Sequence, residues 1–243
     1  MLDYAVAAVV AMLAGAVAAM TGFGIGSLLT PVLALDVDTR VAVAAVSIPH
    51  VVGTAVRLAH LRGRIDRKVL LGFGLTSAAG GLAGAALYEI ASSRWLDAVF
   101  GGLLLFAAIS EMTGLVRRMR FRGWVAWVAG ALSGLLGGLV GNQGGIRSAA
   151  LVGFNLPKDT FVATATGIAL FVDGARLPVY FASHHNDLRS LWPWILAATI
   201  GVTAGTLVGS RALRRVPELW FRRILAVTLA TLGAVMLSRA FSS

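Results

Sequence analysis

Eight apolar stretches fill almost the whole 243-residue chain, and only short polar segments separate them. The stretches cover residues 3–35, 39–61, 69–89, 95–116, 124–154, 159–181, 190–210 and 218–239. A helix needs about 20 apolar residues to cross the hydrocarbon core of a bilayer. Six of the stretches have the length of one such crossing. The pattern therefore predicts an all-α, polytopic membrane protein, with residues 1–243 forming a single integral membrane domain.

The composition of the chain excludes several other classes of protein. Hydrophobic residues make up 58% of the sequence and charged residues 13%, whereas soluble domains have about 45–50% and about 25%. A soluble globular enzyme, a disordered chain and a soluble domain on one membrane anchor are therefore excluded. The net charge is +10, but the basic residues lie mostly in short loops, which is typical of a membrane protein and does not predict nucleic-acid binding. The chain has no cysteine, which excludes disulfides and thiolate metal sites.

Two of the apolar stretches are too long for one crossing, and a glycine-rich segment interrupts each of them. The first break reads Thr21-Gly-Phe-Gly-Ile-Gly26, and the second reads Gly141-Asn-Gln-Gly-Gly-Ile146. Each break divides its stretch into a long leg of about 18 residues and a short leg of about 9. We therefore expect each of these stretches to form a hairpin of two unequal helices.

The two halves of the chain repeat at a constant offset of 121 residues, without a gap. The matched pairs include Gly24 with Gly145, Asp38 with Asp159, Thr39 with Thr160, Gly80 with Gly201 and Gly84 with Gly205. The shared Asp-Thr-x-Val-Ala motif and the shared glycine spacing exceed what chance produces in a chain rich in Ala, Gly and Leu. We expect repeat 1 over about residues 3–116 and repeat 2 over about 124–239, packed on each other as one unit.

The distribution of Lys and Arg predicts how the chain is inserted. If both broken stretches enter and leave on the same side, 14 basic residues lie on one side of the membrane and 4 on the other. If each broken stretch crosses once, the division is 10 to 8. The positive-inside rule favours the first arrangement. We therefore expect an inverted repeat in the plasma membrane, with residues 62–68 and 117–123 in the cytoplasm and both termini outside.

The two breaks together predict one central site. Irregular backbone at membrane depth is tolerated where it lines a cavity, and inverted-repeat carriers place their binding sites at such breaks. The short legs begin near Gly26 and Ile146, so their free N–H groups would favour an anion at the membrane midplane. The candidate binding residues at the breaks are Thr21, Gly22, Gly24, Gly26, Asn142, Gln143, Gly144 and Gly145. The alternative is that the glycines only allow close packing, which is the preferred interpretation for Gly80-x-x-x-Gly84 and Gly201-x-x-x-Gly205.

Ionisable residues inside the apolar stretches are costly and usually face a cavity or a partner. Arg147 lies in the first turn of the second short leg, and Asp173 and Arg176 share one helical face. Two interpretations stay open: a structural Asp173–Arg176 ion pair, or two arginines that bind an oxyanion beside a carboxylate that orients them or carries a proton. His50 titrates near neutral pH and is a second proton-coupling candidate, although an interior hydrogen-bonding role is commoner. Arg57, near the end of its stretch, is expected to snorkel to the surface.

Other chemistries lack their motifs in this sequence. The adjacent His184 and His185 are predicted in a polar loop without a carboxylate at ligand spacing, so no metal site is expected. There is no G-x-S-x-G, H-E-x-x-H or phosphate-loop motif, so we expect neither an enzyme nor a cofactor. A non-transporting scaffold subunit and an intramembrane enzyme stay as alternatives to transport. The expected partners are a small anion and the lipid bilayer, and a homo-oligomer is compatible with the sequence.

The sequence around both breaks resembles the sulfite exporter TauE/SafE family of membrane permeases. The resemblance rests on Met20-Thr-Gly-Phe-Gly-Ile-Gly-Ser-Leu-Leu-Thr-Pro31, Gly141-Asn-Gln-Gly-Gly-Ile-Arg-Ser-Ala-Ala-Leu151, Lys158-Asp-Thr-Phe-Val-Ala-Thr164 and Asp173-Gly-Ala-Arg-Leu-Pro178. It covers nearly the whole chain and implies an exporter or permease of a sulfur oxyanion or organosulfonate, such as sulfite or sulfoacetate. Many members have three consecutive glycines at the second break, where this chain has Gly141-Asn-Gln-Gly-Gly145. With the broken helices, the resemblance predicts a secondary transporter that works by alternating access.

Overall fold

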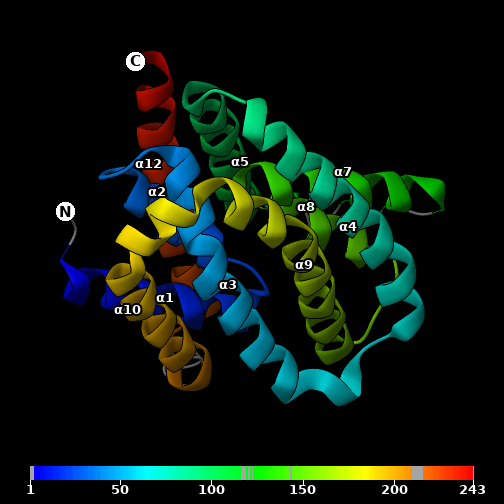
Figure 1. Cartoon of the computed structure of the whole chain (residues 1–243). Coiled ribbons are helices and arrows are strands. Elements are labelled where there is room, and N and C mark those ends of the chain that lie inside the picture. The colour runs from blue at the N-terminus through cyan, green and yellow to red at the C-terminus, as the bar shows by residue number, and fades with distance from the viewer. Residues whose placement is uncertain are drawn as a thin grey trace.

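Helices account for nearly all of the described chain, as predicted. The computed structural model describes residues 3–115, 119, 121, 123–142, 144–209 and 216–242, and no strand occurs among them. In chain order (Figure 1) the elements are α1 (Tyr4–Thr21), α2 (Ile25–Ala34), α3 (Thr39–Leu61), η1 (Arg62–Arg64), α4 (Arg67–Ile90), α5 (Ser93–Thr113), α7 (Trp124–Val140), α8 (Gly144–Val152), α9 (Lys158–Ser190), α10 (Trp192–Ala204), η2 (Gly205–Gly209) and α12 (Glu218–Ser242). Among these described helices, α1, α3 continued by η1, α4, α5, α9 and α12 are long and apolar enough to cross a membrane. The polytopic helical class is confirmed.

The two overlong stretches divide at the predicted glycines. α1 has 18 residues and α2 has 10, while α7 has 17 and α8 has 9. One boundary was wrong: α9 continues to Ser190, so the segment with His184 and His185 is helical, with a kink at His184 (φ −122°, ψ 22°). The His184 ring lies 3.1 Å from the Asp187 carboxylate, and pairs at this spacing support a helix even where its surface is polar.

Polar side chains mark where several helices begin. Asp3, Asp38, Asp66 and Ser92 each accept a hydrogen bond from a backbone N–H in the first turn of α1, α3, α4 and α5. Such caps satisfy donors that have no partner inside the helix. The short polar linkers therefore also define the helix ends.

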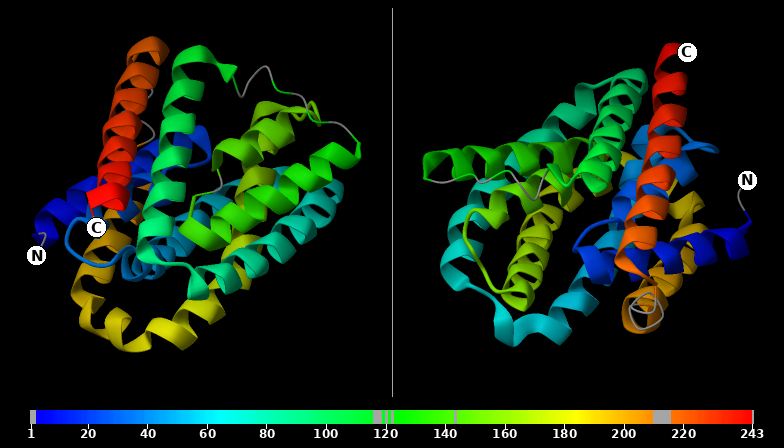
Figure 2. Two further views of the ribbon diagram at one scale, coloured as in Figure 1. Left: turned by 90° about the horizontal axis from the view of Figure 1, so that it is seen from above. Right: turned by 180° about the vertical axis from the view of Figure 1, so that it is seen from behind.

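Glycines allow helices from the two predicted halves to pack in close contact. A Cβ atom at Gly84 would lie 2.0 Å from the carbonyl oxygen of Leu135 on α7, and one at Gly205 would lie 1.9 Å from that of Met12 on α1. Accordingly α4 packs on α7 and α10 packs on α1, while α3 packs on α9. α5 packs on α12, and these two helices lie side by side in both views of Figure 2. A two-fold relation between the halves would produce this pattern, because the 121-residue offset maps α4 onto α10 and α7 onto α1.

Contacts between distant segments define two opposite ends of the molecule. The basic end comprises residues 62–68, 111–113, 158–159 and 216–223, where Arg64 pairs with Asp159 and Arg222 pairs with Glu111. The terminal end comprises residues 3–4, 36–40, 88–97, 184–194 and 239–242, and both chain termini lie toward it, at the upper left of Figure 1. A chain that crossed once at each broken stretch would place Arg64 and Asp159 on opposite sides, so these contacts support the hairpin arrangement.

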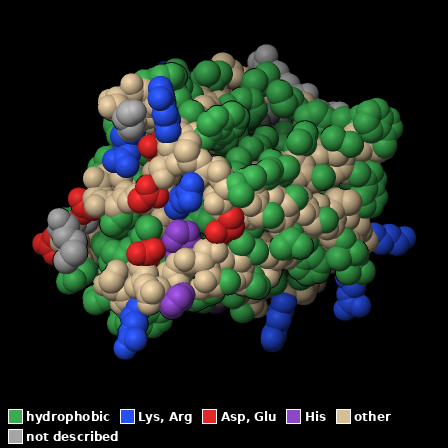
Figure 3. Space-filling model, turned by 45° about the horizontal axis from the view of Figure 1, so that its top comes forward, with side chains coloured by type: hydrophobic (Ala, Val, Ile, Leu, Met, Phe, Trp, Pro, Cys, Tyr) green, Lys and Arg blue, Asp and Glu red, His purple; other side chains and the backbone are tan. Residues whose placement is uncertain are grey.

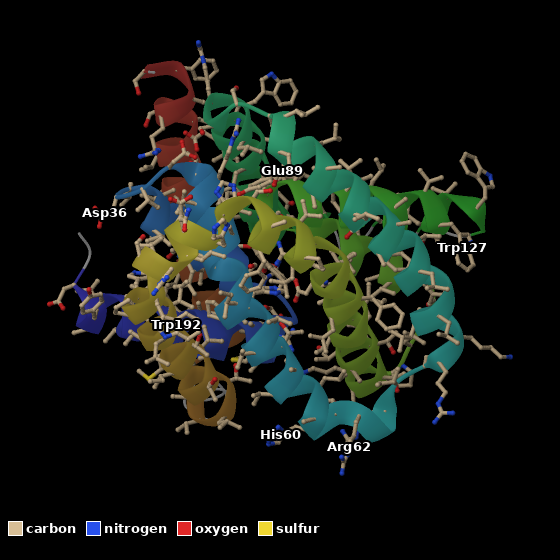
Figure 4. The ribbon with its side chains drawn as sticks, in the orientation of Figure 1. Asp36, His60, Arg62, Glu89, Trp127 and Trp192 are labelled. Atoms are coloured by element: carbon tan, nitrogen blue, oxygen red, sulfur yellow. The ribbon has the colours of Figure 1, made fainter. Side chains whose placement is uncertain are left out.

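Part of the predicted basic side cannot be placed. Arg117, Arg118, Arg120, Arg122, Arg211, Arg214 and Arg215 lie outside the described residues. Within the described chain, His60 and Arg62 point away from the helices at the lower edge of Figure 4, far from Asp36 at the terminal end.

The outer surface has the character of a lipid-facing one. Figure 3 shows broad areas of hydrophobic side chains, with acidic side chains gathered on the left part of that face and several basic side chains projecting at its right and lower edges. Exposed tryptophans lie near the beginnings of four helices, at Trp95, Trp124, Trp192 and Trp220. Tryptophan is enriched at membrane–water interfaces, so these positions agree with helix ends at the two membrane surfaces.

Candidate functional site

The first break is a short irregular segment between α1 and α2. Gly22 (φ +84°) ends α1 with its N–H bonded to the Ala18 carbonyl, and Gly24 (φ +131°) precedes α2. Both backbone conformations favour glycine. The Thr21 hydroxyl lies 2.6 Å from the Phe23 carbonyl oxygen and 3.0 Å from that of Val17. Thr21 therefore helps to hold the shape of the break.

The second break also begins at a glycine with a positive φ, and it contacts the first break. Gly141 (φ +72°) ends α7, Gly145 lies in the first turn of α8, and Gln143 lies outside the described residues. The Ser27 hydroxyl on α2 donates to Asn142 Oδ1 at 3.2 Å. The contact between the breaks demands glycine, because a Cβ atom at Gly26 would lie 2.4 Å from the Gly141 carbonyl oxygen and one at Gly144 would lie 2.1 Å from Phe23 Cβ. The structure thus brings both predicted breaks together at one place.

Arg147 extends from the first turn of α8 to the opposite break. Its side chain is buried, with 2% of its surface exposed, and its Nη2 donates to the Gly22 carbonyl at 3.3 Å. Its Nε and Nη1 atoms are buried without a hydrogen-bond partner. A buried guanidinium normally has all its donors satisfied, so these two nitrogens remain able to donate hydrogen bonds to an acceptor.

Arg57 belongs to the same cluster, and the expectation that it snorkels was wrong. It is 5% exposed, and its Nη1 donates to the Ala18 carbonyl at 2.6 Å while its Nε donates to Thr166 Oγ1 at 3.0 Å. Its Nη2 lies 3.5 Å from the Gly22 carbonyl oxygen. A cation at the carbonyl end of α1 is favourable, because the last carbonyls of a helix lack partners. The sequence showed that Arg57 is a charge inside an apolar stretch. It did not show toward which neighbouring helix α3 directs this side chain.

Asp173 connects the two remaining candidates on α3 and α9. Its Oδ2 lies 2.8 Å from His50 Nδ1, and its Oδ1 lies 2.8 Å from Arg176 Nη2 and 3.0 Å from Arg176 Nε. Arg176 Nη1 donates to the Gly137 carbonyl at the end of α7, at 2.8 Å. The structural ion pair is therefore present, and each Arg176 nitrogen has a protein partner. Arg57 and Arg176 thus play parallel parts, because each brings a guanidinium from the long helix after a break to the carbonyl end of the helix before it.

The centre of the molecule carries an excess of positive charge. In the described part of the chain the buried charged side chains are Arg57, Asp97, Arg147, Asp173 and Arg176. Asp97 lies at the terminal end, where the Thr39 hydroxyl and Arg239 contact it. Three guanidinium groups at the centre are thus opposed by one carboxylate. Burying charge without compensation costs several kcal/mol per ion, so the arrangement favours an anion as the missing partner.

A pocket of about 850 Å³ reaches the breaks from the basic end. Thr21 of the first break and Gly145 and Ser148 of the second lie in its wall, and so does the Glu111–Arg222 pair at the basic end. Small-molecule sites are concave and carry a few polar groups in an apolar wall, as this pocket does. The pocket thus gives a route from the basic end to Gly145 and Ser148, which precede and follow Arg147 in the chain.

No group of three metal-ligating side chains occurs among the described residues, and the paired His184 and His185 do not form one.

Comparison with known proteins relates the chain to one family. A protein-family model described as sulfite exporter TauE/SafE matches residues 7–236. No curated protein and no solved structure matches the chain.

Proposed function

Because this chain belongs to the sulfite exporter TauE/SafE family, whose members are membrane transporters of sulfur-related anions, we propose that it carries a small sulfur oxyanion or organosulfonate across the plasma membrane. Sulfite and sulfoacetate are the substrates that fit this class. Transport proceeds by alternating access around the two breaks, driven by a proton or by the membrane potential. The observation that carries the proposal is the excess of buried arginine over buried carboxylate at the breaks.

Direct contact with the anion is assigned to Arg147 and to the N-terminal ends of α2 and α8. Arg147 has two buried nitrogens without a partner, and backbone N–H groups at a helix N-terminus attract anions. Gly145 lines the pocket, and a Cβ atom there would meet nothing closer than Phe106 at 3.9 Å, so no side chain obstructs an approach to that backbone. Arg176 acts less directly, because Asp173 and the Gly137 carbonyl already occupy its nitrogens.

A proton can be coupled to this site through His50 and Asp173. The 2.8 Å hydrogen bond joins an imidazole to the carboxylate that holds Arg176. A proton gained or lost by this pair changes how strongly Arg176 is held at the end of α7. Proton binding by His50 and Asp173 can therefore affect the anion site through Arg176, without a further ionisable group at the breaks.

The two ends of the molecule differ in the way that alternating access requires. The pocket opens the breaks toward the basic end, while at the terminal end the Thr39 hydroxyl donates to Asp97 and ties α3 to α5. The 121-residue offset relates Thr39 and Asp97 to Thr160 and Glu218, and Glu218 lines the pocket. If the second half took up the closed arrangement of the first, and the first half the open arrangement of the second, the pocket would close and the terminal end would open. By the positive-inside rule the basic end is cytoplasmic and both termini are outside.

The decisive experiment is flux in proteoliposomes. Purified protein is tested with sulfite, sulfate, thiosulfate, sulfoacetate, taurine and acetate under an imposed proton gradient or membrane potential. We expect saturable movement of at least one sulfur anion, lost in Arg147→Met and kept in Arg189→Met, a matched change of an exposed arginine on α9. If none of these anions moves under any gradient, the proposal is wrong, and a scaffold role becomes the better account.

A further inference from the structure

We infer that the central site is matched in charge to a doubly charged anion, with Arg57 setting the preference for two charges over one. The inference rests on the proposed function and names the charge class of its substrate. It comes from the charge count at the breaks and from the different hydrogen bonding of the three buried arginines.

The charge count exceeds what a singly charged ligand can neutralise. Arg57, Arg147 and Arg176 are 5%, 2% and 1% exposed, and Asp173 is fully buried. With a neutral His50 the cluster carries two positive charges in excess, and with an imidazolium it carries three. In either state a monoanion leaves at least one buried positive charge without a counterion, which is costly at membrane depth.

The other described carboxylates in or near the pocket, and the one at the terminal end, do not change the charge balance of the buried cluster. Asp97 is held at the terminal end by Thr39 and Arg239. Glu111 and Glu218 line the pocket at the basic end, where Glu111 pairs with Arg222 and Glu218 is exposed. The opposing charge at the breaks must therefore come from the ligand.

The three arginines divide into one that can touch the ligand and two that supply charge only. Arg147 has two unpartnered nitrogens, whereas each nitrogen of Arg57 lies within 3.5 Å of a protein oxygen: Thr166 Oγ1, the Ala18 carbonyl or the Gly22 carbonyl. Arg176 is likewise occupied, but its removal would leave Asp173 without its guanidinium. Arg57 is therefore the position at which one charge can be removed while the ligand's contacts are kept.

The test compares anions of similar shape that differ by one charge. Binding of sulfate against methanesulfonate, and of sulfoacetate against ethanesulfonate, is measured by thermal shift and by competition in flux. The dianion of each pair should bind at least about tenfold more tightly to the wild-type protein, the scale set by one further charge about 10 Å away at an effective dielectric constant of about 20. In Arg57→Gln the preference should fall about tenfold, and in Arg57→Lys, which keeps the charge, it should return.

The outcomes separate this inference from the function on which it rests. If no anion binds or moves, the proposed function fails. If monoanions bind as well as their dianion partners, transport stands and the charge match is wrong. The same holds if Arg57→Gln leaves the preference unchanged. The wild-type comparison needs no variant, so it decides the matter even if Arg57→Gln does not fold.

Discussion

Replacing Arg147 by methionine should separate a binding arginine from a structural one. In the structure this guanidinium is buried together with those of Arg57 and Arg176, and its hydrogen bond to the Gly22 carbonyl is 3.3 Å long. Methionine has a similar length and removes both the uncompensated charge and the unpartnered nitrogens. Burial of an ion costs several kcal/mol, whereas this long hydrogen bond of a charged group contributes at most about 1.5–3 kcal/mol. The unfolding midpoint without ligand should therefore stay unchanged or rise.

The effect on ligand binding should have the opposite sign. Hydrogen bonds to charged groups contribute about 1.5–3 kcal/mol each, so the loss of two such bonds should weaken binding by roughly 100- to 20,000-fold. At a ligand concentration of about 100 times the wild-type Kd, the ligand stabilises the wild-type protein by about 2.7 kcal/mol. A variant with a Kd raised about 100-fold would gain only about 0.4 kcal/mol at that concentration. The ligand-induced thermal shift should thus nearly vanish.

Arg176→Met is the matched control for this measurement. It breaks a buried ion pair and a hydrogen bond to the Gly137 carbonyl, and such a break costs about 3–5 kcal/mol even without ligand. Thermal-shift curves of both variants, with and without sulfite or sulfoacetate, give the comparison. The reasoning is refuted if Arg147→Met lowers the unliganded midpoint as much as Arg176→Met does and keeps the full ligand-induced shift.

Further predictions concern the breaks, the helix packing and the orientation of the chain. Gly26→Ala places a Cβ atom 2.4 Å from a carbonyl oxygen of the other break, so saturable flux should be lost while detergent-solubilised protein stays monodisperse; normal flux would contradict the contact. Gly84→Ala should lower the free energy of unfolding by about 1–3 kcal/mol because its Cβ atom meets the backbone of α7, whereas Gly102→Ala, which meets nothing within 4 Å, should not; equal unfolding midpoints would argue against this packing. The chain has no cysteine, so in whole cells a membrane-impermeant thiol reagent should label Trp192→Cys and not Arg62→Cys; the reverse result would invert the topology.

Several features of the site could be predicted because they depend on local pattern. The positive φ angles of Gly22, Gly24 and Gly141 follow from a glycine run inside an overlong apolar stretch. The pairing of Asp173 with Arg176 follows from their spacing on a helix, although the sequence left open whether it occurs. The location of Arg147 in the first turn of α8 follows from the same break. None of these required knowledge of how distant helices pack.

The roles of the buried arginines could not be predicted in this way. Arg57 lies near a helix end, where lysine and arginine side chains commonly reach the membrane surface, yet the packing of α3 on α9 turns it toward the first break. Thr21 was expected to offer a donor to the ligand, but its hydroxyl contacts carbonyls of its own break. Both outcomes depend on the rotation of one helix or one side chain relative to its neighbours.

The amino-acid sequence alone indicates a helical membrane protein and shows where its apolar stretches break, and it predicts that the breaks carry donors for an anion. Run length, glycine placement and loop charge are local properties of the sequence. The thickness of the bilayer and the positive-inside rule relate them directly to the spans, the breaks and the orientation. Which guanidinium groups have all their donors satisfied, and which one does not, follows from the tertiary structure and not from the local sequence. That distinction depends on carbonyl and carboxylate oxygens from helices far apart in the chain, because a buried arginine is partnered by whatever the packing brings within hydrogen-bonding distance.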